Sequence, residues 1–415
     1  MVVIILMSRP IDTPPKGFRS GPYEYHEETI IDINNLTNTG LGVGRDEDNW
    51  VIFVPYCIPG EKVKARIFRN HKNHSEADLV EIISHSKYRV DPSCKYYGKC
   101  GGCQYQHIQY DEQLKWKKQQ VVELLKFMVG TDALVNDIIS SPVKYNYRSK
   151  ITPHFNKPKN GELGPIGFQQ FGRRSLIDID HCKIAKKNIN NTLKDIRHGI
   201  LQKSSSYKKG ATILIRSDHQ ENIHTKADSI AEEMVGQIKF NFPAGGFFQN
   251  NPYILEKFTD HVRNEAKSND SKFLVDAYCG AGLFALTSAK AFDEVTGIEI
   301  SDDSILWAKN NLQKNKIGNV KFISGKIENL FSDIEYRNDE TSVIIDPPRK
   351  GCSEDFLLQL FKFNPRKVVY VSCNPATQMR DLKLFIKNGY KLKRTQPFDL
   401  FPQTRHLECI MTLEV

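Results

Sequence analysis

The chain has 415 residues, of which 40% are hydrophobic and 26% charged, a composition that excludes intrinsic disorder and allows two or three folded domains. Its 58 lysines and arginines exceed its 49 aspartates and glutamates, and the net charge of +9 favours a polyanionic partner. No apolar run approaches the roughly 18–20 residues of a membrane-spanning helix, and Val2–Met7 is too short for a signal-peptide core. We therefore expect a cytoplasmic monomer with no membrane segment.

The first predicted domain is a small β-barrel over residues 25–86, which follows a flexible N-terminus at residues 1–24. Short β-type runs, such as Thr29–Ile33 and Trp50–Val54, are separated by glycines and by the Pro59-Gly60 turn. Basic and aromatic residues are mixed through the segment, as in OB-like barrels that hold single-stranded nucleic acid. The alternative is a plain solvated surface, and the barrel segment alone leaves both open.

A cysteine cluster marks the next segment, residues 87–250, which is predicted to be a mixed α+β domain with a helix near 113–129. Cys94, Cys100 and Cys103 lie together on a glycine-rich loop, and Cys182 is a plausible fourth ligand. In a reducing compartment such cysteines suggest metal binding or catalysis more than disulfides. Four thiolates suit either tetrahedral zinc or a [4Fe-4S] cluster, and the spacing does not separate these.

Residues 251–415 show strands alternating with helices, which predicts a doubly wound, Rossmann-like α/β domain. A helix from Ser304 is indicated because Ile305, Ala308 and Leu312 share one face, and Gly318 is its expected end. The predicted strands cover residues 273–276, 295–300, 320–324, 342–346, 367–372 and 407–413.

A glycine turn, Asp276–Gly282, lies between the first of these strands and a helix, where glycines let the backbone approach a ligand closely. Glu299 ends the next strand, near the spacing at which dinucleotide-binding folds place an acid on ribose hydroxyls. The glycines alone do not exclude NAD, because Ala285 is an allowed replacement for a third glycine. The Asp346-Pro-Pro-Arg349 loop at a later strand end favours a methyltransferase, since its carboxylate can accept a hydrogen bond from a base or cofactor amine.

A candidate nucleophile, Cys373, follows the strand 367–372 at the same edge of the sheet. C5 of uracil is too electron-poor to attack a sulfonium methyl group unaided, but a thiolate that adds to C6 makes C5 nucleophilic. A base must then remove the C5 proton so that the thiolate can leave. Glu408, in His406-Leu-Glu408, is the candidate base.

Together these motifs resemble the RNA (uracil-5-)-methyltransferase family, whose motif series they match in order. The matching segments are Phe248-Gln-Asn-Asn251, Asp276–Gly282, Asp346-Pro-Pro-Arg-Lys-Gly351, and Ser372-Cys-Asn-Pro375 followed by His406–Glu408. The resemblance implies that Cys373 is the nucleophile and Glu408 the base. It implies contacts with S-adenosylmethionine or its surroundings for Gln249, Tyr278, Glu299 and Asp346.

The resemblance also extends to the N-terminal and middle parts of the chain. It implies that the barrel is a TRAM domain, and it favours a [4Fe-4S] cluster over zinc at Cys94, Cys100, Cys103 and Cys182. Tyr147-Arg-Ser-Lys150 and Phe168 resemble the family's middle-domain signature, and either RNA contacts or a structural role would explain them.

The predicted function is methylation of C5 of a uridine in structured RNA, through a covalent bond between Cys373 and C6 of the base. The favoured substrate is 23S rRNA, and a T-loop uridine of tRNA is the alternative. An RNA cytosine-5 methyltransferase is a second enzyme class to consider, because Cys352 follows the Asp-Pro-Pro motif, although Arg349 stands where that class has its cysteine. A non-catalytic RNA-binding protein is the third possibility.

Overall fold

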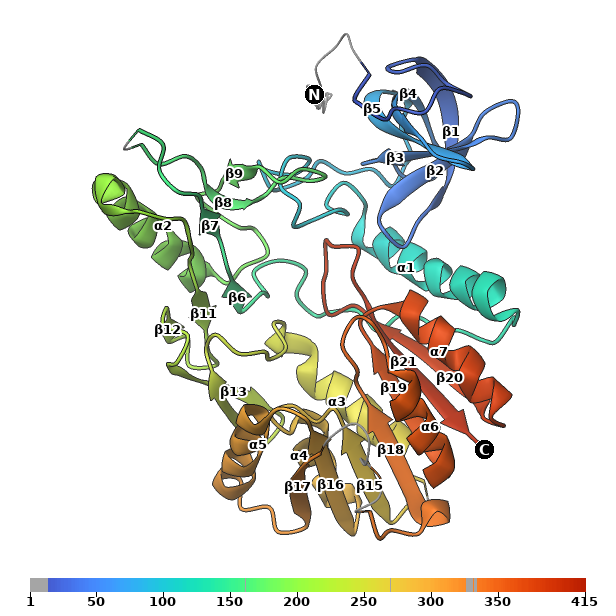
Figure 1. The fold of residues 1–415 in the computed structure, drawn as a ribbon, viewed down its shortest axis with the longest axis vertical. Helices are drawn as coiled ribbons and strands as arrows, with labels where there is room; N and C mark the ends of the chain where they lie inside the picture. The colour runs from blue at the N-terminus through green and yellow to red at the C-terminus, as the bar shows by residue number, and fades with distance from the viewer. Residues whose placement is uncertain (1–13, 161, 269, 326–330, 332–333) are drawn as a thin grey trace. The chain divides into compact units, whose positions relative to one another are not determined.

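The computed structural model describes residues 14–160, 162–268, 270–325, 331 and 334–415 (Figure 1). It divides into two compact units, of which the first runs to Gln120 and includes Gln169–Ile177 and Gln403–Arg405, and the second holds the remainder. The apolar Val2–Met7 segment lies outside the described residues. Over the described ranges, no helix is both long and apolar enough to cross a membrane. The predicted domain boundaries, cytoplasmic location and monomeric state stay predictions.

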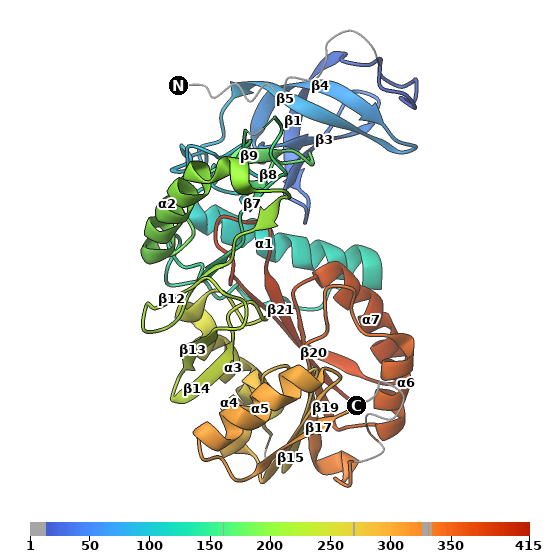
Figure 2. The ribbon, with the colours of Figure 1, turned by 60° about the vertical axis from the view of Figure 1, so that its left-hand side comes forward.

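A closed five-stranded barrel forms the core of the first unit, and its strands are seen from a second side in Figure 2. Val63, Ala65 and Ile67 alternate along β4 and are fully buried in the barrel. Lys62 and Lys64, which alternate with these residues, face outward, 3.9 and 3.8 Å from carboxylates of β1. The predicted OB-like barrel is confirmed. Its strands, in the order β1-β2-β3-β5-β4, are β1 (Glu28–Leu36), β2 (Leu41–Arg45), β3 (Val51–Pro55), β5 (His74–Ser84) and β4 (Glu61–Asn70).

Helix α1 (Tyr110–Leu124) continues into a single π-helical turn, Leu125–Val129, and confirms the predicted helix. Gly130 ends it with φ of 78°, a left-handed conformation that glycine adopts without steric cost, and its N–H bonds the carbonyls of Leu125 and Lys126. A stop of this kind satisfies carbonyls that the end of a helix would otherwise leave unpaired.

The regular elements of the middle segment are short antiparallel strands and one long helix, as the α+β prediction requires. β11 pairs with β6 and β12, β7 with β8 and β10, and β13 with β14. Helix α2 buries Ile189 and Leu193 against this layer. The elements are β6 (Lys150–Ile151), β7 (His154–Phe155), β8 (Ile166–Gln169), β9 (Leu176–Asp178), α2 (Lys187–Gln202), β10 (Ala211–Thr212), β11 (Ile215–Ser217), β12 (Ile223–His224), β13 (Ile230–Val235) and β14 (Ile238–Pro243).

A seven-stranded sheet, in the order β17-β16-β15-β18-β19-β21-β20, is the centre of the C-terminal part of the chain. Its first five strands are mutually parallel, whereas β21 runs antiparallel to both β19 and β20. The sheet confirms the predicted doubly wound fold and adds one strand, β20, that was not predicted. The strands are β15 (Phe273–Ala277), β16 (Glu294–Glu299), β17 (Val320–Ser324), β18 (Thr341–Ile345), β19 (Lys367–Ser372), β20 (Lys391–Phe398) and β21 (Glu408–Glu414).

Both faces of this sheet are covered by helices, and consecutive strand residues pack on opposite sides. Leu274 packs in one core with Phe258 of α3, while its neighbour Val275 packs in a second core with Phe385 of α7. Full burial of one such side chain stabilises the folded state by about 1.5–3 kcal/mol. This packing fixes the carboxyl ends of the parallel strands together at one end of the sheet. The helices are α3 (Pro252–Ala266), α4 (Leu283–Ser288), α5 (Asp302–Lys314), α6 (Glu354–Phe363) and α7 (Pro375–Lys387).

Candidate active site

The chain makes a tight left-handed turn directly after β15. Tyr278, Gly280 and Gly282 have φ of 67°, 54° and 89°, and a side chain at Gly282 would lie 2.9 Å from the ring of Phe322. Glycine adopts this conformation freely, but for a residue such as tyrosine it costs about 1–2 kcal/mol. Strained residues of this kind gather at binding sites, and Tyr278 is therefore held in place by its surroundings.

Two carboxylates support the turn. Oδ2 of Asp276 accepts a hydrogen bond from the backbone N–H of Ala285 at 2.8 Å, and Glu299 accepts one from the N–H of Gly280 at 3.2 Å. The other oxygen of Glu299 accepts from the next two backbone amides at 2.9 and 3.0 Å. Oδ1 of Asp276 is buried without a hydrogen-bond partner, and burial raises the pKa of this carboxyl. A buried acceptor left unpaired in this way suits a site that takes a hydrogen-bonding ligand.

Asp346, Cys373 and Glu408 meet where β18, β19 and β21 come together. Ser372 pairs with Cys409 across the antiparallel strands β19 and β21. Cys373, which follows Ser372, therefore lies opposite Glu408, which precedes Cys409. Burial raises the pKa of Glu408 well above its usual range, and the charge of Asp346 raises it further. Burial also raises the pKa of Asp346, to about 7. Burial and the neighbouring carboxylate therefore both disfavour the ionised form of Glu408.

Arg349 is a site residue that the sequence analysis did not predict. Burial raises the pKa of the Cys373 thiol to about 11, as do Glu408 and Asp346, whereas the charge and hydrogen bond of Arg349 lower it. The carbonyl oxygen of Arg349 accepts hydrogen bonds from Asn374 Nδ2 at 3.0 Å and Thr377 Oγ1 at 3.2 Å. These bonds fix the arginine loop against the loop that carries the cysteine. The sequence feature that could have indicated Arg349 is its position directly after Asp-Pro-Pro at the end of a strand.

Cys352, the candidate nucleophile of a cytosine-5 enzyme, is buried in the core beneath this loop. Its backbone N–H donates to Asp381 at 2.9 Å, and Tyr370 donates to the same carboxylate oxygen at 2.7 Å. Burial and the charge of Asp381 raise the pKa of the Cys352 thiol. The environment of Cys352 is therefore that of a packed residue rather than of a nucleophile.

Gln249 lies in the loop between β14 and α3 and is largely buried. The residues on its C-terminal side hold this loop. Nδ2 of Asn251 donates to the Leu400 carbonyl at 2.9 Å, and the carbonyl of Asn250 accepts from the Ser149 N–H at 2.8 Å. These bonds fix the backbone directly after Gln249.

Two cations hold the preceding part of the same loop, residues 244–246. Arg216 is fully buried and donates to the carbonyls of Ala244 and Gly246 at 2.8 and 2.9 Å. Lys150, its cross-strand partner, donates to the carbonyls of Gly245 and Gly246 at 3.0 Å each. Burial, together with the charge of Arg216, lowers the pKa of Lys150 to about 8. This geometry favours the structural role for Lys150 over an RNA contact.

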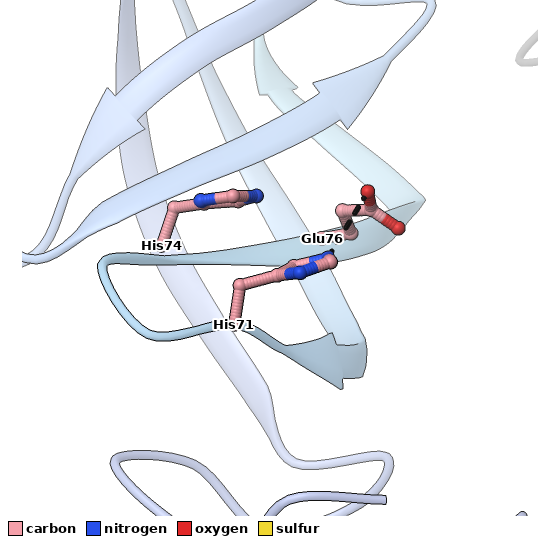
Figure 3. A group of neighbouring side chains, drawn as sticks. All are labelled: His71, His74 and Glu76. Atoms are coloured by element: carbon pink, nitrogen blue, oxygen red, sulfur yellow. Dashed lines mark ion pairs between the residues drawn. The ribbon is translucent and has the colours of Figure 1, made fainter.

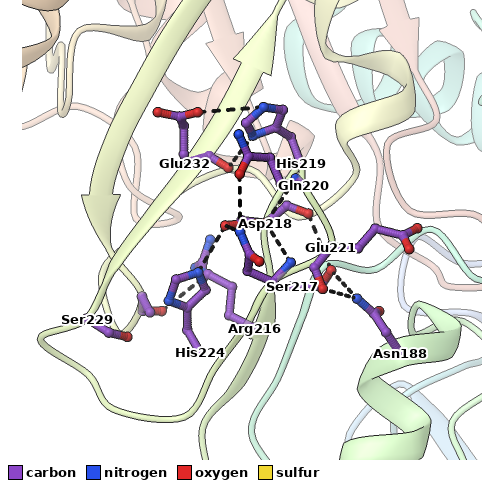
Figure 4. Close-up of polar contacts among 12 residues, drawn as sticks. Asn188, Arg216, Ser217, Asp218, His219, Gln220, Glu221, His224, Ser229 and Glu232 are labelled. Atoms are coloured by element: carbon purple, nitrogen blue, oxygen red, sulfur yellow. Dashed lines mark hydrogen bonds and ion pairs between the residues drawn. The ribbon is translucent and has the colours of Figure 1, made fainter.

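A polar network around Asp218 supports the strand that carries Arg216 (Figure 4). One carboxylate oxygen of Asp218 accepts from the backbone amides of Gln220 and Asn222, both at 2.9 Å. The other lies 3.1 Å from Nε2 of His224. Burial opposes ionisation of Asp218, but the bonds from His224 and Asn222 outweigh it and lower the pKa. The turn after β11 is thereby closed, and Arg216 is held in place.

The predicted cluster cysteines belong to different units. Cys94, Cys100 and Cys103 lie in the first unit, where Sγ of Cys100 accepts a hydrogen bond from the Gly102 N–H at 3.4 Å. Cys182 lies in the second, where Asn190 bonds both its backbone N–H, at 2.7 Å, and its carbonyl, at 3.0 Å. All four are half-buried and form no disulfide.

Methyl transfer is the chemistry that this edge of the sheet fits, and the fold is that of S-adenosylmethionine-dependent methyltransferases. Residues 199–415 match the family described as tRNA (Uracil-5-)-methyltransferase, and residues 27–80 match the TRAM domain. The chain belongs to the RNA (uracil-5-)-methyltransferase family.

Individual relatives match almost the whole chain. A tRNA (uracil(54)-C(5))-methyltransferase of Schizosaccharomyces pombe is 42% identical, over 94% of this chain and 79% of the relative. The Saccharomyces cerevisiae protein of the same name is 36% identical, over 95% and 76%. The solved structure of Pyrococcus abyssi tRNA (uracil-54, C5)-methyltransferase with S-adenosyl-L-homocysteine has a TM-score of 0.72 at 22% identity, covers 93% of this chain and all of its own, and confirms the fold. The protein is an S-adenosylmethionine-dependent methyltransferase of uracil C5 in RNA.

Proposed function

We propose that the substrate is tRNA and that the target is the T-loop uridine at position 54. Support comes from the two fungal relatives, which carry that activity in their names and match 94% and 95% of this chain. These relatives favour the tRNA alternative over 23S rRNA, which the sequence analysis had preferred.

We also propose that Gln249, Tyr278, Glu299 and Asp346 hold S-adenosylmethionine, which supplies the methyl group when bound. The residues present fit this ligand, because the left-handed turn after β15 brings backbone close to the strand ends. The unpaired Oδ1 of Asp276 and the acidic side chain of Glu299 offer acceptors at the same edge.

In the proposed mechanism, the thiol proton of Cys373 passes to solvent, and the sulfur bonds to C6 of the uracil. The C5–C6 double-bond electrons move toward the C4 carbonyl, which makes C5 nucleophilic. C5 then bonds to the methyl group, and the electron pair of the broken sulfur–methyl bond would stay on the donor's sulfur. Glu408 then removes the C5 proton, the double bond re-forms, and the thiolate leaves. Arg349 stabilises the Cys373 thiolate before it bonds to C6 and again when it leaves. The placement of Cys373 and Glu408 at one position between β19 and β21 is the observation that supports this assignment most strongly.

The RNA assignment is tested with unmodified transcripts of tRNA and 23S rRNA, incubated separately with protein and labelled S-adenosylmethionine. We expect 5-methyluridine in the tRNA digest, found by mass spectrometry, and none in a matched transcript whose T-loop uridine is replaced by cytidine. Product confined to 23S rRNA would overturn the tRNA assignment while leaving the uracil chemistry intact.

Removing the cation beside the nucleophile should slow the reaction. For Arg349→Gln we expect kcat/KM to fall about 100-fold, because the thiolate loses the charge that stabilises it. Arg349→Lys should recover part of the loss, and Arg337→Gln, which changes an exposed arginine, should have no effect. Initial rates of methyl incorporation measure all three, and an unchanged rate in Arg349→Gln would remove this residue from the mechanism.

The pH dependence follows from the raised pKa values at the site. The reaction needs a deprotonated Cys373 thiol and an ionised Glu408, but the pKa of Cys373 is raised to about 11 and burial raises the pKa of Glu408 well above its usual range. The active protonation state therefore becomes more populated as pH rises, and kcat/KM should increase from pH 6 to pH 9. A profile that is flat or falls across this window would contradict the proposed protonation states.

The iron–sulfur cluster remains a prediction for Cys94, Cys100, Cys103 and Cys182, with zinc as the alternative. The hydrogen bond to Sγ of Cys100 is of a kind that commonly surrounds cluster sulfurs. Protein purified without oxygen should contain about four iron atoms and four labile sulfides per chain if the cluster forms. Zinc in place of iron would favour the alternative, and loss of either metal in Cys100→Ser would assign the site.

A further inference from the structure

The turn that joins β4 to β5 in the barrel brings together three side chains that the methyl-transfer reaction does not use. The backbone N–H of His71 donates to the carbonyl of His74 at 2.8 Å, which closes a four-residue turn. The two imidazole rings stack, with centroids 4.2 Å apart and an angle of 17° between their planes. Glu76 lies two residues beyond His74, on the same side of β5. Figure 3 shows the three side chains together at the hairpin.

The polar atoms of this trio, His71, His74 and Glu76, are close enough to share one ion. Each residue offers one ligand atom, and the three atoms lie within 4.8 Å of one another. Nε2 of His71 is 3.3 Å from Oε1 of Glu76. Ligands of a tetrahedral zinc ion, with bonds of about 2.0–2.1 Å, lie about 3.4 Å from each other. The His71–Glu76 pair already has this spacing, and the ligand atom of His74 lies within 4.8 Å of both.

His74 is oriented by neighbours that are not part of the trio. Its Nδ1 lies 2.9 Å from Oδ1 of Asn73, an acceptor, which assigns the ring proton to Nδ1 and leaves the lone pair on Nε2. The ring of Phe53 packs edge-on against it at 4.9 Å. A second hydrogen bond that fixes the tautomer is the usual support of a metal-binding histidine.

The other oxygen of Glu76 has a separate partner. Nη1 of Arg69 lies 3.7 Å from Oε2 of Glu76, while Oε1 faces His71. The glutamate can therefore keep its arginine and still offer one oxygen to an ion. Nε2 of His71 is buried and makes no well-directed hydrogen bond, and the Glu76 carboxylate 3.3 Å away is its charged neighbour.

We propose that His71, His74 and Glu76 form a binding site for a divalent transition-metal ion, with Zn²⁺ the best-suited ion. Two imidazoles and a carboxylate are ligands that zinc accepts readily, whereas Ca²⁺ and Mg²⁺ require oxygen ligands. The bound ion would join the end of β4 to the start of β5 and so fix the tip of the hairpin.

The test counts zinc equivalents bound by the full-length protein in competition with a chromophoric chelator. Because the cluster cysteines also bind zinc, the informative quantity is the difference between variants. The double variant His71→Asn/His74→Gln should bind one equivalent fewer than the wild type, whereas His85→Asn, an exposed histidine of the same unit, should match the wild type. Equal stoichiometry in all three proteins would overturn the proposal.

A second variant separates ligation from general loss of histidine. Glu76→Gln preserves the size of the side chain and both imidazoles. We expect it to lower the zinc affinity of this one site at least about tenfold, because a charged ligand is lost. The zinc-dependent rise in unfolding temperature should shrink in the same variant. Unchanged affinity in Glu76→Gln would remove the glutamate from the site and leave only a pair of stacked histidines.

Discussion

Cys373→Ala is expected to abolish methylation, with kcat lowered by at least about a thousandfold, because the substitution removes the sulfur that forms the bond to C6. The affinity for the tRNA transcript should change by less than about threefold, because the contacts that bind the RNA do not require the covalent bond to form. Initial rates of methyl incorporation and filter binding measure the two quantities on the same preparation.

Cys352→Ala provides the matched control for this variant. Cys352 is buried in the core, so its loss should cost about 1 kcal/mol of stability and leave the rate nearly unchanged. The two variants distinguish the uracil mechanism from the cytosine one. An active Cys373→Ala together with an inactive Cys352→Ala would show that the nucleophile has been assigned to the wrong loop.

Glu408→Gln is expected to accumulate a covalent complex with RNA while turnover falls about 100- to 10,000-fold. The carboxamide has the same shape but cannot accept the C5 proton, so the methylated adduct forms and does not resolve. Loss of the Glu408 charge also removes one of the causes that raise the pKa of Cys373, which favours adduct formation. A denaturing gel detects the complex as a band of reduced mobility.

Two controls make the adduct specific. Adding Cys373→Ala to Glu408→Gln should remove the band, because the sulfur that forms the bond is gone. Glu414→Gln, at the far end of the same strand, should behave as the wild type. A band that survives in the double variant would mean that another residue is linked to the RNA.

Much of the fold could be predicted because apolar runs and glycine turns mark the buried strands. β20 could not, since Lys391–Phe398 is largely polar and contains Pro397, and an edge strand of the sheet tolerates both. The predicted end of α5 was also wrong. The helix stops at Lys314 rather than near Gly318, because Asn315 caps it and donates from its side chain to the carbonyl of Lys239 at 2.7 Å.

The candidate site could be predicted where its residues directly follow strands, as Asp346 and Cys373 do, because the carboxyl ends of parallel strands lie together at one end of the sheet. Arg349 could not, since an arginine after two prolines resembles a solvated loop residue until Asn374 and Thr377 are seen to hold its backbone. The role of Lys150 was equally hidden, because its partners are backbone carbonyls distant in sequence.

Release of tritium from tRNA transcripts labelled at C5 of uridine tests the central claim most directly. Proton abstraction from C5 must accompany each completed transfer, so the wild type should release one tritium from the T-loop uridine for each methyl group incorporated, and Cys373→Ala should release none. Methyl incorporation without tritium release would place the methyl group elsewhere on the RNA and contradict the assigned chemistry.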